Sequence, residues 1–379
     1  MVGTGAHWGC CCLSVLTPKP SATRLVLYSR SAQLRSIVPS PCNQLGQLAA
    51  MPSSIIKAFR RALHGVLFGA SLGSLAVLCN IVQVVTLLLY PINRKLVGQI
   101  NALICDAIWR TINVAMERRN GARITFSGDH AVVPMNKQPV LGSINPTLPP
   151  TESAIVICNH LCAIDWAVIN TLAIRRGMLA HGKYFIKSSM KYLPLFGPGM
   201  LLAGFPFLSR NWASDQHKID AIFKTLREDR LPCWLISFLE GTRLTPKKLA
   251  ESQAFCQKNG RPVLQNVMYP RKKGLVATLS ALRDSHVHYV YDMTIAYRYR
   301  PTGAVNEVFP NVATIHTDYL GDDWDFHLHV DRIPIADIPE DPAVVEQWIE
   351  DRWVKKDQLI AQWKAAWPGT SKVPIPAKL

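Results

Sequence analysis

The distribution of apolar and polar positions divides the chain into two regions. Residues 63–90 are almost wholly apolar and contain no Asp, Glu, Lys or Arg. As one helix this segment would extend roughly 42 Å, and a bilayer core is about 30 Å thick, so a single tilted span would fit. Asn80 and Gln83 near its middle also allow a kinked or re-entrant helix pair. A helix buried in a soluble domain is the third alternative.

A second helix is predicted directly after the apolar segment. Apolar residues recur at helical spacing over residues 100–116, with Asp106 and Arg110 on one side. This pattern is typical of an amphipathic helix that lies in a membrane interface. Basic clusters both precede and follow the apolar segment, so the positive-inside rule assigns no sidedness.

From residue 121 onward, short strand patterns alternate with helical ones, which is typical of an α/β domain. Strands are predicted at residues 123–127, 154–158, 184–187, 205–208, 233–238, 289–297 and 326–330, and helices at residues 163–175 and 214–228. The proline-rich stretch 134–150 is expected to be a loop. Asp341 and Pro342 predict the start of a last helix, which ends near residue 367.

The last predicted helix is rich in tryptophan and in charge. Its tryptophans are Trp348, Trp353, Trp363 and Trp367. Indole rings favour the bilayer interface, and the many charged residues between them exclude a span. We therefore predict that this helix lies on the membrane surface. The alternative is that the tryptophans pack in the core of the neighbouring domain, because they do not share one helical face.

Composition and charge narrow the class of protein. The chain has 379 residues, of which 49% are hydrophobic and 18% charged, which excludes a disordered chain and allows one large domain or two ordinary ones. The net charge of +16 favours anionic partners such as phosphates, nucleic acid or an anionic lipid surface. No nucleic-acid-binding module is recognisable, so no nucleic-acid partner is expected. The 10 cysteines show no paired C-x-x-C and predict reduced, mostly buried thiols.

The N-terminal residues 1–51 differ from the rest of the chain. They lack sustained periodicity and contain basic residues but no acidic ones. We expect a disordered leader or a mis-assigned start, with Met51 as the true first residue. A transit peptide is the alternative, because such peptides are also poor in acidic residues.

His160 and Asp165 are the first candidates for chemistry, since they follow the predicted strand 154–158 directly. Within one regular helix their side chains would point about 140° apart, so they meet only if His160 lies in the strand-to-helix turn and Asp165 in the first helical turn. The carboxylate would then fix the imidazole tautomer, and the histidine could take a proton from a substrate hydroxyl. A loop histidine without a catalytic role is the alternative.

A second candidate site follows the strand predicted at residues 233–238. Gly241 frees backbone N–H groups for an anion, and Thr242 and Arg243 add donors suited to phosphate. Arg210 follows another predicted strand. Further basic residues around these segments are Lys187, Lys191, Lys247, Lys248, Arg271, Lys272 and Lys273. Each alone is usually a solvated surface charge, but together with the apolar segment they indicate an anionic headgroup.

These motifs, in this order, resemble those of the glycerolipid acyltransferases of the PlsC type. The matching residues are Asn159, His160 and Asp165 in the first motif, Arg210 in the second, and Glu240, Gly241, Thr242 and Arg243 in the third. The resemblance covers about residues 63–300 and favours the eukaryotic branch, which contains lysophosphatidic acid, lysocardiolipin and lysophosphatidylinositol acyltransferases. Leu239 and Leu244 replace the Pro and Ser common in the third motif, which affects the identity of the acceptor more than the reaction.

The resemblance implies an α/β fold, namely a PlsC-type acyltransferase domain with a central mixed sheet flanked by helices and preceded by a membrane helix or helix pair. The implied segments are a leader at residues 1–51, anchoring and amphipathic helices at 52–120, the catalytic domain at 121–335, and a Trp-rich helix and tail at 336–379. In this family pattern His160 is the general base and Asp165 orients it. The residues implied to bind the substrate phosphate are Arg210, Glu240, Gly241, Thr242 and Arg243, with support from Asn159, Lys187 and Lys191.

The implied reaction moves a fatty acyl group from acyl-CoA to the sn-2 hydroxyl of lysophosphatidic acid and gives phosphatidic acid. Lysophosphatidylinositol or another lysophospholipid is the alternative acceptor, and a non-catalytic lipid-binding membrane protein is the alternative of another class. No cofactor or metal is expected, because acyl-CoA is a co-substrate with a good leaving group. The bilayer is the expected partner, in the endoplasmic reticulum or, alternatively, in a mitochondrial membrane. The oligomeric state stays open.

Overall fold

The computed structural model describes residues 53–133, 152–209 and 212–367. The predictions for residues 1–51, for the loop at residues 134–150 and for Arg210 therefore lie outside the described residues. The described residues from Ser54 onward form one compact unit. The boundaries predicted for the leader, the anchoring helices, the catalytic domain and the C-terminal segment stay predictions.

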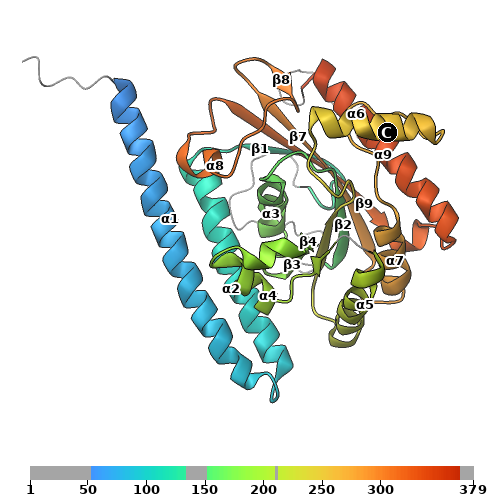
Figure 1. Ribbon diagram of the computed structural model, residues 1–379, viewed down its shortest axis with the longest axis horizontal. Coiled ribbons are helices and arrows are strands. Elements are labelled where there is room, and N and C mark those ends of the chain that lie inside the picture. The colour runs from blue at the N-terminus through green and yellow to red at the C-terminus, as the bar shows by residue number, and fades with distance from the viewer. Residues whose placement is uncertain (1–52, 134–151, 210–211, 368–379) are drawn as a thin grey trace, which may run out of the picture. The chain divides into compact units, whose positions relative to one another are not determined.

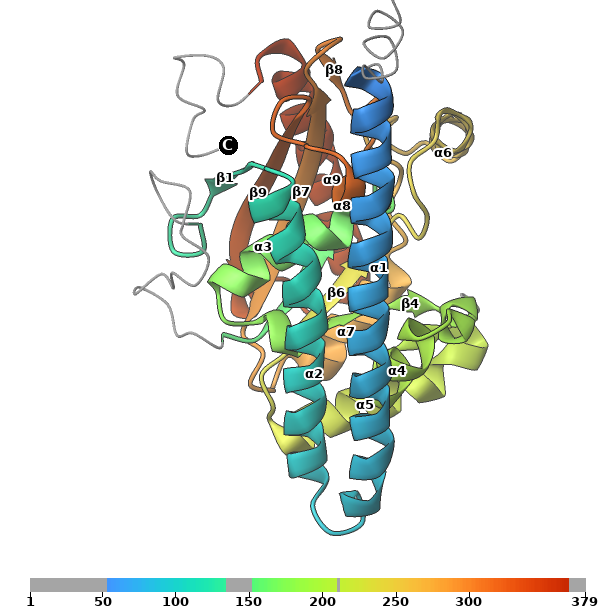
Figure 2. The same ribbon diagram turned by 90° about the vertical axis from the view of Figure 1, so that its left-hand side faces the viewer.

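Two long helices begin the described chain and lie side by side in opposite directions (Figure 2). They are α1 at Ser53–Thr86 and α2 at Arg94–Val114, with the short helix η2 at Leu87–Leu89 between them and the π-helical turn η3 at Ala115–Arg119 after them. Ala58–Leu89 is the one described helical segment that is long and apolar enough to cross a membrane. The second helix begins before the predicted residue 100, because the Asn93 side chain accepts a hydrogen bond from the Leu96 N–H and caps it.

A mixed sheet of seven strands lies at the centre of this unit (Figure 1). Its strands are β1 at Ile124–Gly128, β2 at Ala154–Cys158, β3 at Gly182–Tyr184, β6 at Trp234–Phe238, β7 at Tyr289–Tyr299, β8 at Ala304–Val305 and β9 at Trp324–Pro334. The order is β1-β9-β7-β2-β6-β3, with β8 paired to β7. Strands β7, β2, β6 and β3 are parallel neighbours, whereas β9 is antiparallel to β7. A separate parallel pair consists of β4 at Ile186–Lys187 and β5 at Phe207–Leu208.

Helices cover both faces of the sheet, which confirms the predicted fold class (Figure 1). Side chains alternate along β2, so Val156 and Cys158 pack in the core shared with α3, whereas Ile155 and Ile157 pack in the core shared with α7 and α9. The helices after β2 are α3 at Asp165–Arg175, η4 at Leu179–His181, η5 at Ser188–Tyr192, α4 at Phe196–Leu202, α5 at Trp212–Asp229, α6 at Pro246–Lys258, α7 at Lys273–Leu282, α8 at Thr314–Thr317, η6 at Ile335–Asp337 and α9 at Pro342–Ala365.

The prediction that the last helix lies on the membrane surface is wrong. In α9, Trp353 and Trp363 are 0% and 1% exposed and pack in the core between the helix and the sheet. The ring of His327 in β9 contacts Trp363 with 4.5 Å between centroids. The charges of α9 do not keep it out of the core, because Lys356 is buried in an ion pair with Asp292.

Candidate active site

The candidate catalytic residues gather at one edge of the sheet. Strands β2, β6 and β3 are parallel neighbours, so their carboxyl ends lie at the same edge. His160 follows β2, residues 240–243 follow β6, and Lys187 ends the short strand that follows β3. Ligands of open parallel sheets bind outside the carboxyl ends of the strands, so this edge is the expected place for a substrate.

His160 and Asp165 meet through a hydrogen bond of 2.7 Å between Nδ1 and Oδ2. His160 lies in the turn after β2 and Asp165 in the first turn of α3, which is the geometry that their spacing predicts. Because the carboxylate accepts, Nδ1 carries the hydrogen and Nε2 is the basic nitrogen. No described residue bonds to Nε2, and the side chain is 22% exposed. The imidazole can therefore take a proton from a bound hydroxyl.

Asp165 is fully buried and bonded on several sides. Its Oδ2 accepts from the backbone N–H groups of Leu161 at 2.7 Å and Cys162 at 3.1 Å, and its Oδ1 accepts from the Tyr297 hydroxyl at 2.7 Å. Burial, and next the nearby carboxylate, raise the pKa of Tyr297 well above its ordinary value, so the phenol stays protonated and donates. These donors fix the position of the carboxylate that orients the imidazole.

Two neighbours hold the ring and the loop of His160. Phe238, the last residue of β6, stacks on the imidazole with centroids 4.2 Å apart and planes 20° apart. The Asn159 amide donates to the carbonyl of Ile295 at 3.0 Å and accepts from its N–H at 2.8 Å, which joins the loop to β7. Asn159 is fully buried, so its side chain supports the site without reaching the substrate.

The third-motif segment, residues 240–243, turns beside His160. The carbonyl of His160 accepts a hydrogen bond from the N–H of Leu244 at 2.8 Å, so the two loops are joined directly. Gly241 has a φ of +68°, and a Cβ there would lie 2.9 Å from Nε of Arg271. Only glycine meets both conditions without strain or displacement of Arg271. Arg271 therefore packs against this loop from a distant part of the sequence.

Basic groups around the loop differ in whether a substrate could reach them. Arg243 is exposed, and no described residue bonds to its guanidinium. The Lys248 ammonium donates a hydrogen bond to the Thr242 hydroxyl. Lys272, by contrast, is buried and pairs with Glu350 at 2.7 Å. Arg243 is thus the arginine of the motif that remains available for an anionic ligand.

The second-motif residue and the two predicted supporting lysines are placed only in part. Lys187 is exposed and ends β4, which pairs with β5 outside the central sheet. Lys191 is exposed in η5, where its ammonium lies 4.9 Å from the centroid of the Tyr192 ring. Arg210 lies outside the described residues. Both lysines therefore stay predicted supporting residues.

Glu240 differs from the other residues of its motif because its carboxyl is buried. The residue is 4% exposed, and the carboxyl approaches the His160 N–H and the Trp353 indole but closes no hydrogen bond with a described residue. Burial raises the pKa of Glu240 well above its ordinary value, which favours the neutral acid. A carboxyl this deeply buried is shielded from a substrate outside the loop, so Glu240 supports the loop from inside the domain.

Three neighbours of the site were missed by sequence reasoning: Phe238, Tyr297 and Trp353. Phe238 and Tyr297 belong to predicted strands, but no local signal connects either with His160 or Asp165. Their contacts depend on how distant segments pack. Among the described residues, no group of three or more His, Cys, Asp or Glu side chains could hold a metal ion.

Known proteins share much of this sequence. The family model described as Acyltransferase matches residues 143–298, and the one described as Acyltransferase C-terminus matches residues 320–373. The chain is 31% identical to 1-acyl-sn-glycerol-3-phosphate acyltransferase 2 of Brassica oleracea, over 80% of this chain and 71% of that protein. It is 29% identical to 1-acyl-sn-glycerol-3-phosphate acyltransferase delta of Mus musculus, over 78% and 72%, and 27% identical to lysocardiolipin acyltransferase 1 of Gallus gallus, over 68% and 62%. The chain therefore belongs to the PlsC-type family of glycerolipid acyltransferases.

Proposed function

We propose that this protein transfers a fatty acyl group from acyl-CoA to the sn-2 hydroxyl of lysophosphatidic acid and forms phosphatidic acid. The observation that carries the proposal is the bonded His160–Asp165 pair at the sheet edge, beside a glycine loop with an exposed arginine. The names of the relatives from Brassica oleracea and Mus musculus support this acceptor. The relative named lysocardiolipin acyltransferase 1 makes another lysophospholipid the second candidate.

In the proposed reaction, Nε2 of His160 takes the proton of the sn-2 hydroxyl while the hydroxyl oxygen attacks the carbonyl carbon of the thioester. The tetrahedral oxyanion collapses, the C–S bond breaks, and the departing CoA thiolate takes the proton from the imidazolium. Asp165 stabilises the imidazolium that exists between these two steps. No nucleophilic side chain is needed, because the acceptor hydroxyl is itself the nucleophile.

The acceptor phosphate is proposed to bind at the loop formed by residues 240–243. Arg243 offers a guanidinium fork, and Gly241 allows the phosphate to approach backbone N–H groups. The ammonium of Lys248 and the guanidinium of Arg271 contact this loop and add positive charge to it. A phosphate held there would keep the sn-2 hydroxyl close to the base, since both loops leave the same edge of the sheet.

We further propose that α1 enters the membrane along one side of the catalytic domain and does not cross the bilayer. Phe68 of α1 stacks on His316 of α8 with centroids 4.7 Å apart, and further along the helix Asn80 donates to the carbonyl of Leu195 at 2.7 Å. A helix bound to the domain at both points lies along it. Its exposed apolar residues include Val66, Leu67, Val77, Leu78, Ile81, Val84 and Val85. They occupy about 120° of the helix circumference and form one lipid-facing surface. The membrane proposed from the family resemblance is the endoplasmic reticulum.

An assay of purified protein in detergent tests the proposed reaction. Release of the CoA thiol from acyl-CoA is followed with lysophosphatidic acid, lysocardiolipin, lysophosphatidylinositol and lysophosphatidylcholine as acceptors. His160→Ala should lower kcat by about 10²–10⁴-fold without changing the thermal melt, whereas His217→Ala, at an exposed histidine of α5, should keep normal turnover. A folded His160→Ala enzyme that retains more than half of its turnover would contradict the mechanism.

A further inference from the structure

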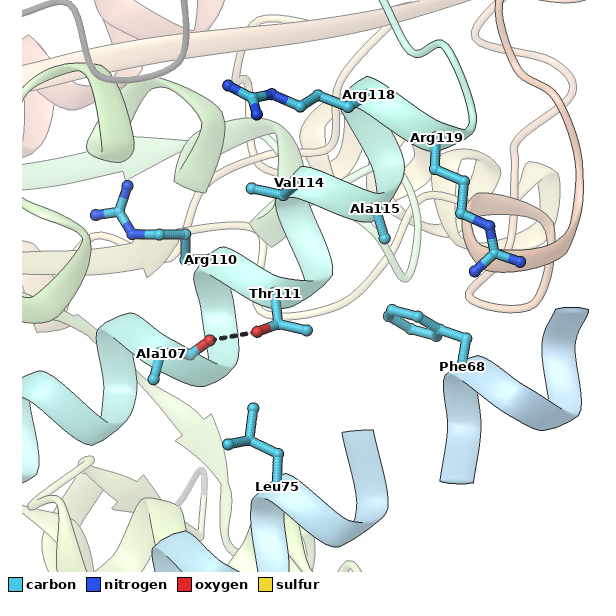
Figure 3. A pocket seen from close by; sticks show the side chains of 9 residues that line it. All are labelled: Phe68, Leu75, Ala107, Arg110, Thr111, Val114, Ala115, Arg118 and Arg119. Carbon is cyan, nitrogen blue, oxygen red and sulfur yellow. Dashed lines mark hydrogen bonds between the residues drawn. The ribbon is translucent and has the colours of Figure 1, made fainter. Parts of the chain in front are cut away.

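A groove lies between α1 and α2 (Figure 3), and none of its lining residues belongs to the catalytic loops. It is an open groove with a volume of about 630 Å³, within the range of roughly 300–1,000 Å³ typical of ligand sites. Asn113 and Trp109 mark the other side of α2, where they contact Ala167 and Trp166 of α3. Thr111, which lines the groove, lies about 160° around the helix from Asn113. A ligand in the groove would therefore not touch the helix that carries the catalytic aspartate.

The floor of the groove is apolar. Its apolar lining side chains are Phe68 and Leu75 from α1 and Ala107, Val114 and Ala115 from α2 and its C-terminal turn. Arg110 also lines the groove, and its guanidinium pairs with Asp106 at 2.7 Å. The hydroxyl of Thr111 donates to the carbonyl of Ala107 at 2.7 Å, so its hydrogen is already bonded (Figure 3). A surface of this kind suits a hydrocarbon chain better than a polar solute.

One end of the groove is basic. The π-helical turn η3 places Arg118 and Arg119 at this end, and both are exposed. Arg119 points toward Phe68, whereas Arg118 points to the opposite side of the turn (Figure 3). The guanidinium of Arg119 lies 6.0 Å from the centroid of the Phe68 ring. The neighbouring Glu117 does not neutralise them, because its carboxylate pairs with Arg175 at 2.7 Å. Two positive charges therefore border one end of an apolar groove.

We propose that this groove binds one anionic phospholipid of the bilayer, with its phosphate at Arg119, Arg118 adding positive charge to the same end, and an acyl chain along Leu75, Thr111 and Val114. A charged end and an apolar floor match a molecule with an anionic head and a long chain. The lipid can reach the groove directly, because Leu75 lies next to the exposed apolar face of α1 on the helix circumference. The inference goes beyond acyl transfer, since a lipid held here is bound but not acylated.

Native mass spectrometry of the full chain in a neutral detergent tests this inference. Dioleoylphosphatidylglycerol should bind as one tight adduct and dioleoylphosphatidylcholine at least about tenfold more weakly, because only the first lipid has a net negative head. Glycerol 3-phosphate, which has the head without chains, should not bind at the same concentrations. Arg118→Gln combined with Arg119→Gln should weaken phosphatidylglycerol binding at least about tenfold. The matched control, Lys218→Gln with Lys224→Gln, removes the same charge from exposed positions of α5 and should leave binding unchanged.

Two further variants separate the groove from the catalytic site. Thr111→Trp fills the floor without changing any charge and should weaken binding of phosphatidylglycerol, while the thermal melt reports that the chain is folded. His160→Ala should bind the lipid as the unaltered chain does, since the measurement needs no acyl transfer. A double arginine variant that binds phosphatidylglycerol at normal strength, or equal binding of the two lipids, would overturn the inference.

Discussion

Replacing Asp165 by asparagine isolates the contribution of its charge, because the surrounding donors dictate how the amide must lie. The Oδ2 position receives hydrogen bonds from the His160 ring and from the backbone N–H groups of Leu161 and Cys162, and a backbone N–H can only donate. The Oδ1 position receives the Tyr297 hydroxyl and the Cys162 thiol, both of which can rotate and accept instead, and it shares the Cys162 N–H with Oδ2. The amide oxygen should therefore take the Oδ2 position and the amide nitrogen the Oδ1 position. The imidazole keeps its tautomer, and the negative charge is lost.

The size of the expected effect follows from the short contact. With 2.7 Å between Nδ1 and Oδ2, the centres of the two charges lie about 4 Å apart, and their attraction is about 4 kcal/mol at an effective dielectric constant of about 20. Proton transfer is incomplete in the transition state, so we expect the loss of about half of this amount or more. That loss lowers kcat by about 30- to 1,000-fold.

The assay compares kcat for CoA release by the unaltered enzyme, Asp165→Asn and Tyr297→Phe at saturating substrates. Tyr297→Phe removes one hydrogen bond from the same carboxylate and no charge, so it should lower kcat by less than about tenfold. Circular dichroism melts establish that each variant is folded. The charge argument would be refuted by a folded Asp165→Asn enzyme with half of normal kcat, or by equal effects of the two substitutions.

Three other outcomes are expected. Membranes washed with carbonate or high salt should retain the protein, because the apolar face of α1 binds the bilayer and salt weakens only electrostatic attraction. Recovery of the protein in the supernatant would contradict this mode of binding. Lys356→Met should lower the free energy of unfolding by about 1–3 kcal/mol in urea titrations, since it removes the buried partner of Asp292, whereas the exposed Lys364→Met should change it little. Burial raises the pKa of the Glu240 carboxyl above its ordinary value of 4.5. Above pH 4.5 the unfolded chain therefore loses a proton that the folded protein keeps. The free energy of unfolding should fall as the pH rises above 4.5. Glu240→Gln cannot ionise, so its thermal melts should depend less on pH between about 5 and 8; parallel pH curves would exclude a neutral Glu240.

Elements encoded by local patterns could be predicted from the sequence. The strand predicted at residues 154–158 is β2, because a strand with neighbours on both sides and helices on both faces needs an uninterrupted apolar run. Asp341 begins the last helix as predicted, and its carboxylate accepts from the N–H groups of Ala343 and Val344. The His160–Asp165 contact belongs to the same class, since one short turn fixes it.

The helices α6 and α7 were missed, although α7 buries Leu275, Thr278, Leu279 and Leu282 at helical spacing. No element was predicted for most of the stretch that contains α6 and α7. Thr245 and Pro246 do carry a helix-start signal, and the Thr245 hydroxyl accepts from the Lys248 N–H. In α6, however, Cys256 is the one fully buried residue, so the apolar positions show no helical period.

Contacts between distant strands could not be predicted at all. Tyr297 and Asp165 are 132 residues apart in the sequence, and their hydrogen bond depends on the register of β7 against β2. The alternating pattern of β7 predicts a strand but not its partner or its register. The tryptophans of α9 were misplaced for a related reason. These tryptophans are spread widely around the helix. Such a spread fits a helix packed against protein on several sides as well as a helix in a membrane interface, so the pattern does not distinguish the two.

The position of α9 explains why the C-terminal segment belongs with the catalytic motifs. Trp353 lies beside the buried carboxyl of Glu240, whose motif binds the loop of His160. Lys356 donates to the carbonyl of Met293 at 2.6 Å, and Met293 is the residue of β7 that pairs with the last residue of β2. The helix thus contacts the third-motif loop and the strand end that precedes the base. If α9 lay on a membrane surface instead, the third-motif loop and the end of β2 would lose these contacts. Trp353 and Trp363 therefore cannot serve as interfacial anchors while they pack in this core.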